Sequence, residues 1–290
     1  MDRPVFLITG ATGYLGRRVA LRAAARGRVY AATHRRPDEV TAGDAVALDI
    51  GDRTAVFDVV ERLAPSVVIH AAAVNPGQGD DKAMWRINAE GSLHVAEAAR
   101  AVDARLVAVS TDIVHDGRNG PYADDVAPTP VNAYGRSKVA GEAAVLDLDP
   151  SAVVVRTSLM YGLDEMDRGT AGFVERLGRG ESLTLFSDVL RNPVSVDTLA
   201  EALVRLTTTD HAGLLNVAGR QVLSRDEFGR KLLAYWGISD DGLIRSGRAA
   251  DISDSIPLDL RLLSDRAERL LGLTFPGVDD VLAAAEVGLS

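Results

Sequence analysis

The feature of this sequence that most constrains its fold is a glycine-rich turn close to the N-terminus. The apolar run Val5–Thr9 leads directly into the turn Gly10–Gly16, and a helical pattern of apolar residues extends over Tyr14–Arg26. An apolar run bounded by turn residues is typical of a buried strand, and apolar residues four apart share one face of a helix. The sequence therefore begins with a predicted strand, a tight turn and a helix.

Such a turn has a chemical use as well as a structural one. Glycines let the backbone bend sharply and bring its N–H groups close to a bound pyrophosphate at the helix N-terminus, where the helix dipole favours anions. The spacing here is G-x-x-G-x-x-G rather than the commoner G-x-G-x-x-G. We expect a dinucleotide to bind at this turn, and the alternative is a plain connection between strand and helix.

The rest of the N-terminal half alternates between strand-like and helix-like segments. Strands are expected at Val29–Thr33, Val46–Leu48, Val67–His70 and Arg105–Val109, and helices at Thr54–Leu63 and Ala83–Ala101. This alternation predicts βαβ units, and therefore an α/β fold with a Rossmann-like, doubly wound parallel sheet.

The pattern changes after Ser110. Residues 110–133 read as a loop with several glycines, prolines and aspartates, followed by a helix at Ala133–Leu148, a strand at Ala152–Arg156 and less regular segments. We expect residues 1–157 to form a dinucleotide-binding domain that also carries catalytic residues. Residues 158–290 are expected to form mainly a smaller α/β substrate-binding cap, partly interleaved with the sheet.

The bulk composition narrows the class of protein. The 290 residues include 32 Lys plus Arg and 41 Asp plus Glu, a formal charge of −9, which argues against nucleic acid or an anionic membrane as a partner. There is no cysteine, so disulfides and thiolate chemistry are excluded. The sequence shows neither a signal-peptide pattern nor an apolar run of about 18 residues, so a cytoplasmic location is expected. A homodimer is compatible with these features.

The residues after the second expected strand indicate which dinucleotide is bound. An NAD site places an acidic residue there for the ribose 2′-hydroxyl, whereas an NADP site uses arginine for the 2′-phosphate. This chain has Thr33-His34-Arg35-Arg36 at that place and no acid before Asp38. We therefore expect Arg35, together with Arg36, to hold a 2′-phosphate. The alternative is a pair of solvated surface arginines.

Three residues at the carboxyl side of the expected sheet predict the chemistry. Tyr134 and Lys138 are four residues apart at the start of an expected helix, so they share one face. A phenol has a pKa of about 10, and a neighbouring ammonium group is expected to lower it. Thr111 adds a hydroxyl just beyond the fifth strand, at the edge where α/β proteins bind ligands. The set predicts proton transfer at a substrate oxygen.

Together these segments resemble a known superfamily. The glycine turn, Val68–Ala73, Ser110-Thr111-Asp112, Tyr134–Lys138 and Arg156-Thr157-Ser158 resemble the extended short-chain dehydrogenase/reductases. Within that superfamily, S-T-D-I-V-H-D-G, P-x-x-x-Y-G-R-S-K-x-x-G-E and R-N-P-V-S-V-D-T-L-A look like the dTDP-4-dehydrorhamnose reductase branch. The similarity covers most of the chain.

The resemblance implies a role for each motif. Tyr134 donates a proton to a ketone oxygen as NADPH supplies hydride, Lys138 binds the nicotinamide ribose and lowers the pKa of Tyr134, and Thr111 hydrogen-bonds the same oxygen. Thr111, Asp112 and Arg191 are expected to contact the substrate, Arg191 through a diphosphate, although a surface role for Arg191 is an equal alternative. The residues expected to contact the cofactor are Gly10, Thr12, Gly13, Tyr14, Leu15, Gly16, Arg35, Arg36, Asp49, Ile50, Ala71, Ala72, Ala73, Asn88, Tyr134 and Lys138. Of these, Asn88 is expected to shape the sheet edge rather than to react.

Neighbouring positions separate the reactions that related proteins carry out. Related dehydratases have Thr-Asp-Glu, whereas this chain has Thr111-Asp112-Ile113, so dehydration is disfavoured. Related epimerases show an acid after the second strand, where this chain has Arg35. Two departures concern the sugar: Leu159 stands where the reductase branch commonly has an aromatic residue, and the Asn75–Asp81 loop differs from the branch pattern. The sugar pocket is therefore expected to be reshaped.

Other polar and large residues have less specific interpretations. His70 is expected to be a satisfied core histidine rather than a base, and His115 fits either a sugar contact or an exposed loop. The remaining residues considered are the acidic pairs Asp80-Asp81 and Asp124-Asp125, expected to be solvated, and Met84 and Trp85, which fit either a pocket wall or the core. No spacing suggests a metal site, and none is expected.

These observations lead to one main hypothesis and its alternatives. We expect an enzyme, an NADPH-dependent oxidoreductase that reduces a nucleotide-linked 4-keto-6-deoxy sugar. The alternatives are a non-catalytic NADP-binding regulatory or sensor protein of the same fold, a sugar-nucleotide epimerase, and a reductase of an unrelated ketone or aldehyde.

Overall fold

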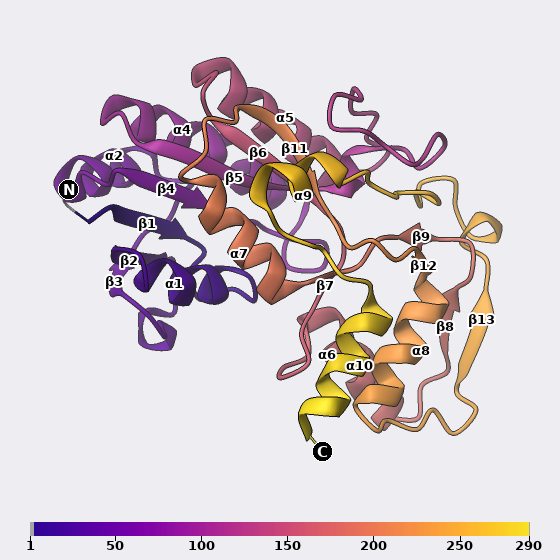
Figure 1. Ribbon diagram of the computed structural model, residues 1–290. Coiled ribbons are helices and arrows are strands. Elements are labelled where there is room, and N and C mark those ends of the chain that lie inside the picture. The colour runs from indigo at the N-terminus through magenta and orange to yellow at the C-terminus, as the bar shows by residue number, and fades with distance from the viewer. Residues whose placement is uncertain (1–2, 290) are drawn as a thin grey trace.

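The computed structural model describes residues 3–289, and its centre is a parallel sheet of seven strands (Figure 1). The strands are β1 (Val5–Thr9), β2 (Arg28–Thr33), β3 (Asp44–Ala47), β4 (Val67–His70), β5 (Arg105–Thr111), β6 (Val153–Thr157) and β11 (Gly213–Val217). Their order is β11-β6-β5-β4-β1-β2-β3, and all neighbours are parallel. The order reverses between β1 and β4, which is where open α/β sheets bind ligands. The predicted doubly wound, Rossmann-like sheet is confirmed.

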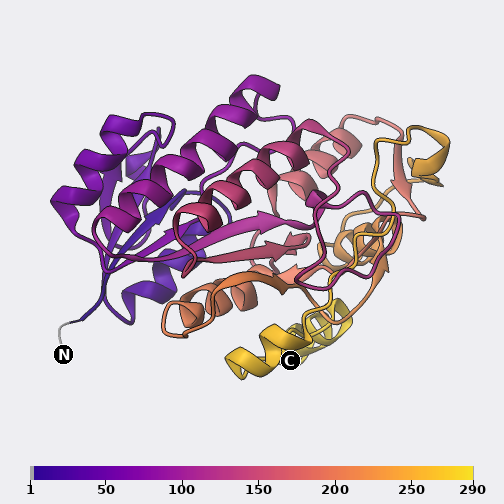
Figure 2. The same ribbon diagram turned by 90° about the horizontal axis from the view of Figure 1, so that it is seen from above.

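Helices cover both faces of this sheet. On one face lie α2 (Arg53–Leu63), α4 (Gly91–Ala101) and α5 (Ala133–Leu148), which run side by side in Figure 2, and on the other lie α1 (Gly16–Ala24) and α7 (Val196–Leu206). Each face has its own apolar cluster, one around Ile8 and Leu199 and the other around Val68 and Leu106, all of them without solvent exposure. Burial of these apolar side chains is the main stabilising contribution to the layers.

The long helix predicted at Ala83–Ala101 is present, but it is not uniform. It begins as α3 (Asp81–Trp85), passes through a π-helical turn, η2 (Arg86–Glu90), and continues as α4. The Asp80 side chain accepts the backbone N–H of Ala83 at 2.8 Å and therefore caps the helix. π-Helical turns inside α-helices are frequent at functional sites, and this one contains Asn88.

The C-terminal part forms a smaller lobe beside the sheet and also contributes to the sheet itself (Figure 1). The remaining elements are β7 (Met160–Tyr161), α6 (Arg168–Gly178), β8 (Leu183–Phe186), β9 (Leu190–Arg191), β10 (Val194–Ser195), β12 (Leu223–Ser224), α8 (Arg225–Tyr235), β13 (Ile244–Gly247), α9 (Asp265–Leu271) and α10 (Val278–Leu289), with short helical turns η1 (Pro37–Glu39), η3 (Asp112–Val114) and η4 (Ala249–Asp251). Because β11 lies beside β6 and α7 packs on α1, the chain after residue 157 is shared between the lobe and the Rossmann layers. In the described part of the chain, no helix has the length and apolar character needed to cross a membrane.

The segment after β5 is held against the C-terminal part of the chain. The backbone N–H of Tyr122 donates to the carbonyl of Arg261, and the N–H of Leu263 donates back to the carbonyl of Tyr122, both at 2.8 Å. The Tyr122 ring packs in a cluster with Leu260 and Leu262. This loop therefore connects the carboxyl edge of the sheet to the lobe, which is where a substrate would meet both.

Candidate active site

The glycine turn lies between β1 and α1, at the point where the strand order reverses. Gly10 has a φ of +70°, a left-handed conformation that favours glycine. A Cβ at Gly10 would stand 2.8 Å from the backbone of Ala72, and one at Gly16 would collide with the carbonyl oxygen of Gly10. The close approach of these backbone segments requires glycine at both positions, and the turn fits a pyrophosphate bound by backbone N–H groups.

The side chains of Thr12, Tyr14 and Leu15 in this turn make contacts with other parts of the protein. Thr12 Oγ1 lies 2.9 Å from Thr33 Oγ1, and the Tyr14 hydroxyl donates to the carbonyl of Glu165 at 3.0 Å. Leu15 is buried in the apolar cluster beneath α1. We therefore expect these three residues to meet a cofactor through their backbone. The Tyr14 bond also ties the turn to the segment that follows β7.

The two arginines after β2 differ in how they are held. Arg36 donates to the Glu39 carboxylate at 2.7 Å and to the carbonyl of Thr12 at 3.4 Å. Arg35 is exposed and has no hydrogen-bond or ion-pair partner among residues 3–289. Its guanidinium is therefore the freer of the two to pair with an anion.

Asp49 follows β3 and carries a charge next to the same edge of the sheet. It accepts the backbone N–H of Gly51 at 2.9 Å and both terminal nitrogens of Arg86 at 3.1 and 3.2 Å. Partial burial raises its pKa, but these donors outweigh burial and the pKa is lowered overall. Ile50 is buried and packs against Gly91. Sequence analysis did not identify Arg86, since its contact with Asp49 joins residues distant in the chain.

Asn88 holds the loop that follows β4. Its side chain is fully buried, accepts the N–H of Val74 at 2.8 Å, and donates to the carbonyl of Val74 at 2.9 Å and to Ser137 Oγ at 3.1 Å. Both amide hydrogens are therefore used within the protein. Asn88 joins the loop after Ala71–Ala73 to α5, in agreement with a shaping role.

Tyr134 lies in the first turn of α5, and its hydroxyl donates to Asn75 Oδ1 at 3.1 Å. Burial, followed by the negative charge of Asp112, raises the pKa of Tyr134 to about 12, while Thr111 and Arg191 act in the opposite direction. The expectation that this pKa is lowered is therefore wrong, and Lys138 is not among the groups that shift it. The phenol is in an environment that disfavours its ionised form, so it is protonated at neutral pH.

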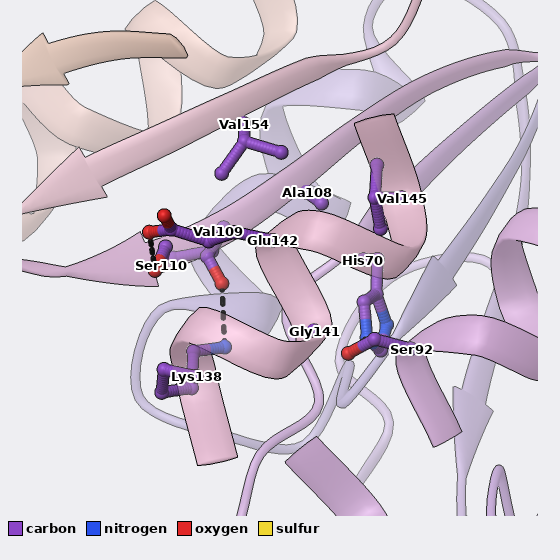
Figure 3. Close-up of a pocket in the computed structure, with 10 residues that line it drawn as sticks. All are labelled: His70, Ser92, Ala108, Val109, Ser110, Lys138, Gly141, Glu142, Val145 and Val154. Carbon is purple, nitrogen blue, oxygen red and sulfur yellow. Dashed lines mark hydrogen bonds between the residues drawn. The ribbon is translucent and has the colours of Figure 1, made fainter. Parts of the chain in front are cut away.

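Lys138 lies one turn further along α5 and is almost completely buried. Its Nζ donates to the carbonyl of Val109 at 2.8 Å, and burial lowers its pKa to about 8, an effect that Glu142 partly offsets. Figure 3 shows this contact beside a small space, with His70 and Ser92 at its other end. The space has a volume of about 10 Å³. The space is too small for a substrate and belongs to the buried surroundings of Lys138.

A buried ion pair supports the helix that carries Tyr134 and Lys138. Glu142 accepts from Arg156 at 2.8 Å and from the Ser110 hydroxyl, and Arg156 also donates to the carbonyl of Val126 at 3.0 Å. These bonds join α5 to β5, β6 and the loop after β5. Sequence analysis quoted Glu142 without assigning it a role, although Tyr134, Lys138 and Glu142 are spaced four apart on one helix face.

Asp112 and Arg191, two residues predicted to contact the substrate, contact one another. The Asp112 carboxylate is 1% exposed and accepts from Arg191 Nη1 at 2.8 and 2.9 Å, from Ser158 at 2.8 Å and from Thr111 at 3.2 Å. These bonds occupy both oxygens of the carboxylate. Asp112 therefore positions the side chains that donate to it. Arg191 is buried, so the alternative of a surface role is wrong.

The two histidines near the site are both buried. His70 is 2% exposed and bonds Thr9 at 2.7 Å and Ser92 at 3.0 Å, which confirms a satisfied core histidine. Burial, with the charge of Lys138, lowers its pKa to about 3. His115 is wholly buried and stacks on the Tyr122 ring at 3.9 Å, so the alternative of an exposed loop residue is wrong.

Two further expectations are corrected outside the site. Asp124 is only partly exposed and accepts the backbone N–H of Asn216 at 2.6 Å, so it is not simply solvated. It fixes β11 to the loop after β5. Met84 is buried, whereas Trp85 is 47% exposed and does not belong to the core.

A hollow in the C-terminal lobe lies near Arg191. It has a volume of about 330 Å³, and its walls are Phe173, Arg176, Ser182, Leu183, Thr184, Leu185, Phe186 and Arg225. Arg225 is exposed to solvent at the rim of the hollow, and the surrounding protein, followed by the charge of Arg191, lowers its pKa to about 10. Two arginines beside a hollow with aromatic walls suit an anionic ligand that also has a flat ring.

A glycine turn at the strand-order reversal, with a protonated phenol at the carboxyl edge of the sheet, places this chain among the dinucleotide-dependent oxidoreductases. More particularly, the chain belongs to the family described as RmlD substrate binding domain, which matches residues 5–254.

Named relatives of this chain are reductases. It is 36% identical over 221 residues to the dTDP-4-keto-6-deoxy-D-glucose reductase of Streptomyces niveus, covering 73% of this chain and 71% of that protein. It is 33% identical over 279 residues to the dTDP-4-dehydrorhamnose reductase of Mycobacterium tuberculosis, covering 92% and 87%. The crystal structure of dTDP-4-dehydrorhamnose reductase from Bacillus anthracis in complex with NADP superimposes with a TM-score of 0.81, at 26% identity and 99% coverage of both chains.

Proposed function

We propose that this protein is an NADPH-dependent reductase of a nucleotide-linked 4-keto-6-deoxy sugar. The observation that carries the proposal is the placement of the Tyr134 phenol in the first turn of α5, at the carboxyl edge of the sheet and within hydrogen-bond reach of Thr111. A reductase needs a protonated acid at the oxygen that becomes a hydroxyl, and Tyr134 meets this requirement at neutral pH. The Streptomyces niveus and Mycobacterium tuberculosis relatives, which are named for reductions of this kind, support the same substrate class.

The glycine turn and Arg35 are the residues that would hold NADP(H). The turn brings backbone N–H groups to a pyrophosphate, and the unpartnered Arg35 guanidinium follows β2, where a 2′-phosphate is bound in this fold. The Bacillus anthracis structure, which contains NADP, supports this assignment. When bound, the cofactor supplies a hydride to the carbonyl carbon.

Each of the three predicted catalytic residues has a separate task. Tyr134 gives its hydroxyl proton to the keto oxygen, and Thr111 donates a hydrogen bond to the same oxygen while negative charge develops there. Lys138 binds the nicotinamide ribose through its ammonium group. The bond from Lys138 to Val109 keeps the ammonium group at the end of β5.

The nucleotide part of the substrate is assigned to the C-terminal lobe. Arg176 and Arg225 provide positive charge at the hollow, and Phe173 and Phe186 provide ring surfaces against which a base can pack. In this assignment residues 1–157 bind the cofactor and react, and residues 158–290 mainly bind the substrate. The negative net charge of the chain supports a small-molecule substrate rather than a nucleic acid. We also retain the expected cytoplasmic location, and a homodimer is compatible with this assignment.

The test is NADPH oxidation by the purified protein with a set of nucleotide-linked 4-keto-6-deoxy sugars, with the product configuration determined by NMR. Wild type is expected to turn over at least one of them, and Tyr134→Phe is expected to lower kcat by about 10² to 10⁴ while NADPH still binds. Tight NADPH binding without turnover of any sugar would favour a regulatory protein and overturn the proposal.

A further inference from the structure

Asn75 contacts the proton donor of the proposed reaction. It lies in the loop after β4, and its Oδ1 accepts the hydroxyl of Tyr134 at 3.1 Å. The two residues are 59 positions apart in the sequence, and no catalytic role was expected for Asn75. The contact occurs in the segment in which this chain departs from the pattern of the reductase branch.

The position of Asn75 is fixed by the same residues that fix α5. Asn88 holds both backbone groups of Val74, the residue before Asn75, and bonds Ser137 on α5. The Ser137 hydroxyl in turn donates to the carbonyl of Tyr134 at 2.8 Å. A buried residue of the π-helical turn therefore sets the loop and the catalytic helix relative to one another.

The chemistry of an amide suits both protonation states of the phenol. The carbonyl oxygen Oδ1 only accepts, so in the free protein Tyr134 is the donor. The amide nitrogen Nδ2 only donates. Rotation of the amide group about the last side-chain bond exchanges the positions of Oδ1 and Nδ2. An amide at this position can therefore accept from the phenol and can also donate to the phenolate.

We propose that Asn75 is a positioning residue that pairs with the Tyr134 hydroxyl before proton transfer and stabilises the tyrosinate after it. This inference rests on the proposed function. When the substrate binds, the Tyr134 O–H turns to the keto oxygen and Asn75 presents Nδ2 to the phenol oxygen. The O–H bond of Tyr134 then breaks and its proton joins the keto oxygen, while NADPH supplies the hydride to the carbon, so that the ketone becomes an alcohol. The Asn75 N–H bond to the phenol oxygen becomes stronger as negative charge develops there.

Two variants of nearly unchanged size separate the functions of the amide. Asn75→Asp keeps an acceptor and lacks the donor, and Asn75→Leu has neither. Both are expected to lower kcat, by about fivefold for leucine and by about tenfold or more for aspartate, whose charge also opposes the tyrosinate. The solvent deuterium isotope effect on kcat is expected to rise in both, because proton transfer becomes slower. Asp81→Asn, an exposed change in the same connection, serves as the matched control and is expected to leave kcat within about twofold.

The deciding measurement is a double-mutant cycle with Tyr134→Phe, read as single-turnover NADPH oxidation. If Asn75 acts through the phenol, Asn75→Leu and Asn75→Asp have no further effect on the residual rate of Tyr134→Phe. If the Asn75 variants lower the rate by the same factor in wild type and in Tyr134→Phe, the inference is overturned and the proposed function is left intact. Absence of turnover by wild type with every sugar would overturn the proposed function and this inference with it.

Discussion

Nη1 of Arg191 donates to both oxygens of the Asp112 carboxylate, at 2.8 and 2.9 Å, and both side chains are buried. The pair joins the end of β5 to β9, and therefore fixes the carboxyl edge of the sheet to the C-terminal lobe. Ser158, which follows β6, donates to the same carboxylate at 2.8 Å. The position of Thr111, which donates to the same carboxylate, relative to the C-terminal lobe thus depends on this small buried network.

Asp112→Asn is expected to destabilise the protein. The carboxamide has nearly the same shape, but it leaves the guanidinium of Arg191 buried without a counter-charge, and loss of one partner of a buried pair costs about 3–5 kcal/mol. Urea unfolding followed by circular dichroism measures the change. The double variant Asp112→Asn/Arg191→Met is expected to recover part of the loss because it removes the unpaired charge. A single variant as stable as wild type would contradict this account of the network.

Arg225→Gln is expected to raise the KM for the nucleotide-linked sugar by about tenfold, with little change in kcat. A hydrogen bond to a charged group contributes about 1.5–3 kcal/mol, and Arg225 lies at the hollow, away from the reacting oxygen. Steady-state kinetics with the sugar as the varied substrate measures the effect. Arg230→Gln is the matched control, because Arg230 is exposed on the same helix and paired with Asp226. Equal effects of the two variants would show that Arg225 has no specific contact.

The sequence predicted six of the seven strands of the sheet, and β11 is the strand that it did not predict. Buried strands such as Val67–His70 are continuous apolar runs, and the glycine turn predicts where phosphate binds; both are local signals. The carboxyl ends of parallel strands meet at one edge, so Thr111 was assigned to the site without knowledge of its contacts.

The contacts that sequence analysis did not identify join segments that are far apart in the chain. The bond between Asn75 and Tyr134, and the contact of Arg86 with Asp49, have no local pattern. The direction of the Tyr134 pKa was also predicted wrongly, because helix spacing shows that Lys138 shares a face but does not show that burial and Asp112 have the larger effect. The burial of a charged side chain depends on the folded structure around it, and the spacing of residues in the sequence does not show it.

Arg35→Ala is expected to weaken NADPH binding by about tenfold or more and to leave NADH binding nearly unchanged. Arg35 has no partner among the described residues, so its charge is available for the phosphate that distinguishes the two cofactors. Fluorescence titration of both cofactors provides the measurement. Arg36→Ala is expected to have a smaller effect, since Arg36 is already paired with Glu39 at 2.7 Å. If Arg35→Ala weakens the binding of NADPH and NADH equally, Arg35 does not bind the 2′-phosphate.

The burial of Lys138 predicts an unusual dependence of stability on pH. The pKa of Lys138 is lowered to about 8 in the folded protein, whereas a lysine in an unfolded chain has a pKa of about 10.4. Below pH 8 both states are protonated, and the folded state carries the cost of a buried charge. Between these values the unfolded chain binds more protons than the folded protein, so this group makes stability rise with pH.

Lys138→Met removes that cost together with the hydrogen bond to the carbonyl of Val109, so its stability relative to wild type is expected to be higher at pH 7 than at pH 10, by about 2–3 kcal/mol. This relative stability is expected to fall as the pH is raised from 8 towards 10, where folded wild type loses its charge. Urea unfolding of both proteins at pH 7 and at pH 10 measures the difference. Lys82→Met is the control, because Lys82 is exposed and its replacement is expected to give a difference that does not vary with pH. A constant difference for Lys138→Met would mean that the ammonium group is not held in a poorly solvated site, and the placement of Lys138 at the end of β5 would then need another explanation.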